Sequence, residues 1–213
     1  MEMLNDEVAG KLKVALSTMK NSVKILYFTQ EFECKFCKET HTFLSEVAGL
    51  NNKIKMEVFD YLKENEKAKE YGVDKIPAIV ICDEKNNDTG MKFYGIPAGY
   101  EINSFVVALV EASGILPEYN ERVIQRINAI SKPVHIQVFI SLGCPYCPDA
   151  VINAHRLALL NKNVKADMVD VTIFSYLGNK YDVSGVPKII INEELELVGA
   201  QPIEKFLELI EKI

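Results

Sequence analysis

The chain repeats itself, and this duplication constrains its fold more than any other feature of the sequence. The motif CKFC at 34–37 recurs as CPYC at 144–147, so the first cysteines of the two motifs lie 110 positions apart. The same shift carries YGVDKIP at 71–77 onto YDVSGVP at 181–187. Landmarks that keep one spacing across the whole chain indicate two copies of one structural unit.

Each half predicts the same order of elements. An amphipathic helix comes first, 5–20 or 117–130, and the second of these starts at Pro117, a residue that suits the first turn of a helix. A β-rich run, the CxxC and a long helix follow, and then a strand, a short helix, two strands and a closing helix. Such strand–helix–strand units build a sheet covered by helices. We predict an α/β protein of two tandem domains, 1–114 and 115–213, each with a central mixed β-sheet flanked by helices.

Composition limits the partners. The formal net charge of −6 argues against nucleic acid or an anionic membrane as the main partner. No stretch approaches the roughly 20 apolar residues that span a bilayer. Residues 1–20 carry early acids and lack the basic start and apolar run of a secretory signal. We therefore expect a cytoplasmic protein, in which CxxC pairs serve metal binding or redox chemistry.

The position of the cysteines favours redox chemistry. A helix N-terminus carries about half a unit of positive charge and unpaired N–H groups, and both stabilise a thiolate. The thiolate is the attacking species in disulfide exchange. We predict that Cys34 and Cys144 are exposed nucleophiles at the helix starts. Cys37 and Cys147, one helical turn further on, would resolve the mixed disulfide.

Each half also has a proline that opens an apolar strand. Pro77 and Pro187 both follow the first cysteine of their half by 43 residues. A proline is tolerated at the first residue of a strand, which is the simpler interpretation. The matched spacing favours instead a cis X–Pro bond beside each disulfide, since cis peptide bonds are essentially confined to proline.

Together these motifs resemble the thioredoxin fold, and CPYC is similar to the motif of glutaredoxins. Two such units in tandem, each with an intact CxxC, resemble the protein disulfide oxidoreductases of thermophilic archaea and bacteria. The resemblance implies two thioredoxin-like domains that oxidise, reduce or isomerise disulfides of protein substrates. It implies no cofactor beyond the redox disulfides Cys34–Cys37 and Cys144–Cys147, and a thioredoxin reductase as the electron donor.

The resemblance extends to the residues before the two prolines, but it also has two departures. Ile76 and Val186 would offer backbone hydrogen bonds to a bound substrate strand. Thioredoxins keep a buried Asp six residues before the first cysteine, where this chain has Phe28 and Val138. Glutathione-using glutaredoxins have a Gly-Gly-x-Asp-like anion site near the last helix, where this chain reads VGAQPIEKF. We therefore expect neither a thioredoxin-style carboxylate relay nor a preference for glutathione.

Three other functions are open. The N-terminal domain of the flavoprotein subunit of alkyl hydroperoxide reductase is also a tandem thioredoxin unit, and it relays electrons to a peroxidase. It typically retains one CxxC, whereas this chain has two. A tetrathiolate zinc site is a second alternative, although zinc ribbons usually separate their pairs by roughly 15–20 residues. The third is a binding scaffold in which the CxxC pairs are structural disulfides.

The two CxxC sites differ in the charges near them. The near neighbours of Cys144 are Gly143, Pro145 and Tyr146, with Asp149 on the helix that follows. Acids raise and lysines lower the pKa of a nearby thiol. We expect Cys144 to be the more stable thiolate, and the C-terminal pair to be the more oxidising and more active one. Cys34 has charges of both signs close in the sequence, which are Glu31, Glu33, Glu39, Lys35 and Lys38.

Three further residues have structural interpretations. Cys82 lies mid-strand in AIVIC, and we expect a buried, inert thiol there. Asp60 and Asp170 recur in register, and each precedes a predicted short helix. N-capping is the commoner role for an Asp at such a position.

Overall fold

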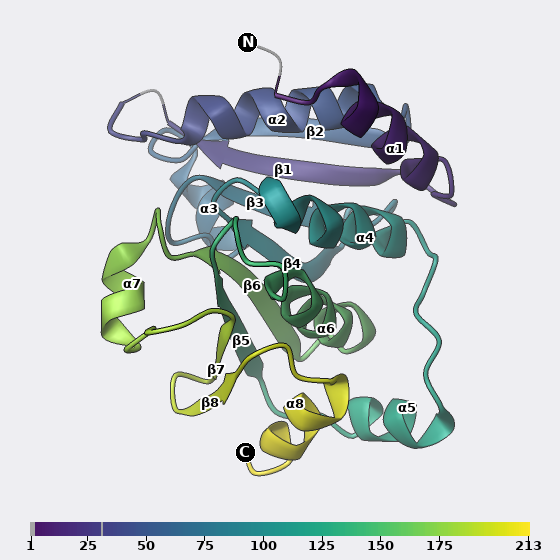
Figure 1. Ribbon diagram of the computed structural model, residues 1–213. Helices are drawn as coiled ribbons and strands as arrows, with labels where there is room; N and C mark the ends of the chain where they lie inside the picture. Colours follow the sequence, from purple (N-terminus) through teal and green to yellow (C-terminus); the bar gives the residue numbers. More distant parts are fainter. Residues whose placement is uncertain (1–2, 31) are drawn as a thin grey trace.

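The computed structural model describes residues 3–30 and 32–213 of the chain (Figure 1). Glu31, one of the acids close to Cys34 in the sequence, lies outside the described residues. The described residues form eight strands in a single sheet, in the order β2-β1-β3-β4-β6-β5-β7-β8. The strands are β1 Val23–Thr29, β2 Ile54–Asp60, β3 Ala78–Cys82, β4 Asp88–Tyr94, β5 Val134–Ile140, β6 Val164–Asp170, β7 Lys188–Ile191 and β8 Leu195–Val198.

The two halves share this sheet. Each half has the same pattern, with a parallel pair (β1 and β2, or β5 and β6) followed by two antiparallel strands. β4 of the first half pairs in parallel with β6 of the second, from Met91 opposite Ala166 to Tyr94 opposite Val169. The predicted fold class, two tandem α/β units with mixed sheets flanked by helices, is confirmed. The joining of the two sheets into one was not predicted.

Helices cover both faces of the sheet. Six of them bury their apolar residues against one face, in the larger hydrophobic cluster. The short helices α3 and α7 cover the other face through Ala68 and Leu177. The helices are α1 Asp6–Leu16, α2 Cys37–Gly49, α3 Asn65–Glu70, α4 Ile102–Ala112, α5 Glu121–Asn128, α6 Cys147–Leu160, α7 Ser175–Lys180 and α8 Ile203–Ile210, with a 3-10 turn η1 at Gly99–Glu101.

The helix that opens the second half starts later than predicted. It begins at Glu121, not at Pro117, because the Asn120 side chain caps it by accepting the Val123 N–H. Residues 113–120 therefore form an extended connection between α4 and α5 (Figure 1). A domain boundary at 114/115 stays a prediction.

Candidate functional site

Both cysteine pairs are disulfide-bonded within their own motif. The Cα atoms are 5.4 Å apart in Cys34–Cys37 and 5.5 Å apart in Cys144–Cys147. In each motif the helix begins at the second cysteine, and the N–H of this cysteine donates to the carbonyl of the first cysteine at 3.4 Å. Each first cysteine therefore lies in the turn that leads from a strand into a helix.

Both disulfides lie at the same edge of the sheet. β1 and β5, which lead into the two motifs, run in the same direction, since β3 is antiparallel to β1 and β4 while β4, β6 and β5 are mutually parallel. Four strand steps separate β1 from β5, which is about 19 Å at the usual spacing of ~4.8 Å. Thiolates that bind one zinc ion lie about 2.3 Å from it, so a single site built from both pairs is incompatible with this geometry.

The exposure of the two first cysteines is unequal. Cys34 is half-buried, whereas Cys144 is 8% exposed. The prediction of an exposed nucleophile is therefore wrong for Cys144 in this disulfide state. Its Sγ lies 3.7 Å from the carbonyl oxygen of Val186, on the loop that packs against it. The second cysteines of the motifs, Cys37 and Cys147, are both buried, as the interior ends of their disulfides.

Each half has a cis peptide bond where the sequence analysis expects one. The Ile76–Pro77 and Val186–Pro187 bonds are both cis. The carbonyl of each proline accepts a backbone N–H from the end of the following hairpin. This N–H belongs to Gly95 in the first half, at 3.0 Å, and to Gly199 in the second, at 2.8 Å. The two proline loops are thus held alike, and their contact with a substrate stays a proposal.

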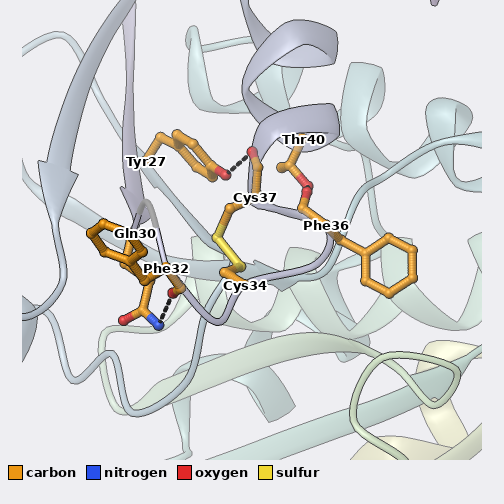
Figure 2. Close-up of a disulfide and its surroundings, with 7 residues drawn as sticks. All are labelled: Tyr27, Gln30, Phe32, Cys34, Phe36, Cys37 and Thr40. Carbon is orange, nitrogen blue, oxygen red and sulfur yellow. Dashed lines mark hydrogen bonds between the residues drawn. A yellow bond between two sulfur atoms is a disulfide. The ribbon is translucent and has the colours of Figure 1, made fainter.

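A tyrosine lies beside the N-terminal disulfide (Figure 2). The Tyr27 hydroxyl donates to the Cys37 carbonyl at 2.6 Å, and Thr40 donates to the Phe36 carbonyl at 2.7 Å. Burial raises the pKa of Tyr27 to about 12, so it stays a neutral donor. These bonds tie side chains of β1 and α2 to carbonyls at the start of the helix that follows the first cysteine.

The position of Tyr27 in β1 shows that the 110-position shift does not align the two halves in this strand. β1 ends at Thr29, five positions before Cys34, whereas β5 ends at Ile140, four positions before Cys144. By their place in the strands, Tyr27 corresponds to Val138, and the sequence analysis named Phe28 instead. The extra residue lies in the loop 30–33, where Glu33 takes a φ of 58°.

A buried carboxyl from the first half lies close to the start of α6 and to the loop that precedes the C-terminal motif. Glu101 is 0% exposed, and one of its oxygens, Oε1, has no hydrogen-bond partner among the described residues, while Ser104 donates to the other. Burial raises the pKa of Glu101 to about 7, and the negative charges of Asp170 and Asp149 act in the same direction. Asp149 lies in the first turn of α6, two residues after Cys147.

Contacts of the two preceding residues, Gly99 and Tyr100, hold Glu101 at this place. The Tyr100 N–H donates to the Leu142 carbonyl at 3.2 Å, in the loop that precedes Cys144. Gly99 approaches so closely that an added Cβ would lie 2.5 Å from the same oxygen. Sequence reasoning missed Glu101 because it searched for the acid within each half, and this acid crosses from one half to the other.

The remaining assigned residues are structural. The Asp60 carboxylate accepts the N–H groups of Leu62 and Lys63, and Asp170 accepts the N–H and hydroxyl of Thr172. Both close the turn after a strand, so the prediction that they cap α3 and α7 is wrong, because these helices start several residues later. Cys82 is a buried free thiol as predicted, and burial raises its pKa to about 12.

The described part of the chain offers neither a metal cluster nor a membrane-spanning helix. Within residues 3–30 and 32–213, no group of three or more His, Cys, Asp or Glu side chains could hold a metal ion. No helix in that part of the chain is both long and apolar enough to cross a membrane.

The fold and the paired disulfides agree with what the chain is similar to. A family model described as a thioredoxin domain matches residues 134–212. The structure of the NTD_N/C domain of alkylhydroperoxide reductase AhpF from Enterococcus faecalis matches with a TM-score of 0.92 and 30% identity, covering 97% of this chain and 99% of that one. The chain belongs to the thioredoxin-fold family, in its tandem form. A protein disulfide oxidoreductase from Aeropyrum pernix matches with a TM-score of 0.90 and 25% identity, covering 97% of this chain and 92% of that one.

Curated relatives of this thioredoxin-fold chain are longer. An NADH dehydrogenase of Bacillus subtilis is 26% identical over 205 residues, which are 96% of this chain and 37% of the relative. An alkyl hydroperoxide reductase subunit of Staphylococcus aureus is 27% identical over 192 residues, 90% of this chain and 34% of the relative. The chain thus spans about a third of the length of the curated relatives it matches.

Proposed function

We propose that the chain is a thiol–disulfide oxidoreductase that exchanges disulfides with protein substrates through both CxxC motifs. The observation that carries the proposal is the repeated arrangement of a disulfide in the turn between a strand and a helix, together with a cis-proline loop. Such a pair opens and closes without large movement of the backbone, because its two cysteines lie three positions apart with their Cα atoms 5.4 or 5.5 Å from each other.

In the reducing direction the dithiol form starts the reaction. The thiolate of Cys34 or Cys144 attacks one sulfur of a substrate disulfide and releases the other as a thiolate. The thiolate of Cys37 or Cys147 then attacks the mixed disulfide and displaces the substrate's second thiolate. Two electrons pass to the substrate, which leaves as a dithiol, and the motif ends as the disulfide. Oxidation of a substrate dithiol is the same sequence reversed.

Glu101 has a role in the second step at the C-terminal motif. Cys147 is fully buried, so its thiol needs a nearby group to take the proton before it can attack. A carboxyl with a pKa of about 7 is suited to that task near neutral pH. We propose that Glu101 is this proton acceptor. The second half has no acid of its own for this role, since Val138 stands where thioredoxins keep a buried Asp.

The substrate contacts are proposed by analogy of position. The backbone of Ile76 and Val186, each directly before its cis-proline, would pair with an extended substrate strand beside the disulfide. Pro77 and Pro187 would pack against it. The electron donor would be a flavoprotein of the thioredoxin reductase type, and no further cofactor is proposed.

A second candidate is an electron relay to a peroxidase. It is favoured by the similarity to AhpF, which is named as a component of an alkyl hydroperoxide reductase. An electron relay would use the same disulfide exchange but would reduce one dedicated partner protein. A general oxidoreductase would exchange disulfides with many protein substrates.

The test is reduction of insulin disulfides by dithiothreitol with wild type, Cys34→Ser, Cys144→Ser and the double variant. We expect the wild type to accelerate the reaction, each single variant to lose one site's share, and the double variant to fall to the uncatalysed rate. Equal activity in all four proteins would contradict the proposal. Activity with a peroxidase and its hydroperoxide, but none with insulin, would favour the relay.

A further inference from the structure

The loops before the two redox motifs are covered differently. In the C-terminal loop, Leu142 is half-buried, and an added Cβ on Gly99 would lie 3.3 Å from the Leu142 Cβ. The residue at the same place before the N-terminal motif is Phe32, two positions before Cys34, and it is 79% exposed. The C-terminal loop is therefore shielded by the first half, whereas the N-terminal loop presents a large apolar side chain to solvent.

Phe32 is held beside the disulfide. The Gln30 side-chain amide donates to the Phe32 carbonyl, within the loop that leaves β1. Figure 2 shows the Phe32 and Phe36 rings on opposite sides of Cys34, both directed away from the Tyr27 hydroxyl. Phe36 is half-buried, so Phe32 is the ring with most surface free for contact.

The neighbouring loop adds a second apolar side chain. The two loops leave the sheet side by side, because Thr29 pairs with Asp60 and the Tyr61 N–H donates to the Thr29 carbonyl at 2.7 Å. Leu62 follows directly and is 70% exposed. The residue at its place in the second half is Thr172, whose hydroxyl is bonded to a carboxylate. The N-terminal rim, formed by Phe32 and Leu62, is thus apolar, whereas the matching positions of the second half are half-buried or polar. The large exposed ring of the C-terminal motif is Tyr146, which is 67% exposed and carries a hydroxyl.

Charge gives this rim no preference for either sign. Exposed acids and lysines alternate around it: Glu33, Lys35, Lys38 and Glu39. The free surface of the two large side chains therefore sets what the rim attracts, and exposed apolar surface of this kind binds apolar surface. In folded proteins, cysteines and the apolar residues beside them are mostly buried. An unfolded polypeptide presents both together.

We propose that Phe32 determines the specificity of the N-terminal disulfide, by contacting a large apolar side chain next to the cysteine of an unfolded polypeptide. The inference rests on the proposed function and names the substrate class of one of its two sites. The chemistry is the exchange already described, in which the Cys34–Cys37 dithiol is oxidised as the bound substrate disulfide is reduced.

Two single-site proteins and two peptides test it. Cys144→Ser/Cys147→Ser leaves the N-terminal site, and Cys34→Ser/Cys37→Ser leaves the C-terminal site. Each peptide carries one intramolecular disulfide, with either Phe or Ser beside one cysteine. We expect the N-terminal site to reduce the Phe peptide about tenfold faster than the Ser peptide, within the range of apolar contacts. The C-terminal site, whose exposed ring is the hydroxyl-bearing Tyr146, should show a smaller ratio than the N-terminal site.

Substitution of Phe32 makes the test specific. In the N-terminal single-site protein, Phe32→Ser should bring the ratio of the two rates to about one, and Phe32→Leu should retain most of it. Val14→Ser is the control, since Val14 is 72% exposed on α1 and is not part of the rim. An unchanged ratio in Phe32→Ser would overturn the inference. If the N-terminal site reduced neither peptide, the proposed function of that site would fail, and the inference with it.

Discussion

The two redox sites have the same motif, the same helix start and the same cis-proline loop, but different neighbours. The side chains beside the N-terminal disulfide belong to its own half: the Tyr27 hydroxyl donates to the Cys37 carbonyl, and Phe32 is exposed to solvent. The C-terminal disulfide is bordered by the other half, through Gly99 and Glu101. When two copies of a unit join edge to edge, one of them gains residues across the junction. The duplication thus produces unequal sites from two copies of the same structural unit.

The largest predicted effect is on stability at Glu101. Its pKa of about 7 in the folded protein lies above the ordinary value of 4.5, so the folded state holds the proton more tightly. The resulting stabilisation is complete below pH 4.5 and is lost as the pH rises through 7, by about 3 kcal/mol. Glu101→Gln should lack this loss. Urea unfolding of both proteins at pH 5 and pH 8 measures it, and an identical pH dependence would contradict the assigned burial.

A smaller effect is expected where the first half contacts the loop before Cys144. Gly99 has a φ of 58°, and an added Cβ would lie 2.5 Å from the Leu142 carbonyl oxygen. Gly99→Ala should therefore cost about 2 kcal/mol and lower the exchange rate of the C-terminal site only. Gly143→Ala is the matched control, since its added Cβ has nothing within 4 Å. Equal unfolding free energies for the two variants would contradict this expectation, because they would show that the loop around Leu142 moves away from the added Cβ at no cost in stability.

The smallest effect belongs to the N-terminal site. Tyr27→Phe removes the hydroxyl that donates to the Cys37 carbonyl, at a cost of about 1 kcal/mol. Urea unfolding of Tyr27→Phe against wild type measures this cost. The C-terminal site should keep its exchange rate, because Val138 occupies the corresponding place there without a hydroxyl. A change in the rate of the C-terminal site would mean that the two sites are coupled through the sheet.

Much of the fold was predictable because it is written in local patterns that occur twice. The cysteines and prolines keep their spacing in both halves, so the strand, turn and helix around each motif could be placed from the sequence. Tyr27 was missed because one extra residue in the loop 30–33 shifts β1 against its motif. The start of α5 was missed because Asn120 is the better cap, although Pro117 suits a first turn.

The contacts across the junction could not be predicted in this way. Glu101 reaches the C-terminal motif only because β4 pairs with β6, and this pairing follows from the edges of two separate units meeting. No local pattern near Glu101 marks it as a buried acid. The greater activity expected for the C-terminal pair stays a prediction.

The most direct test of this account is the pH dependence of disulfide exchange at each site alone. In the protein that retains only Cys144 and Cys147, the rate should rise with an inflection near pH 7, as Glu101 becomes able to accept a proton. Glu101→Gln should remove that inflection, and the protein that retains only the N-terminal site should lack it. The same inflection in Glu101→Gln would contradict the claim that the first half supplies the proton acceptor of the second.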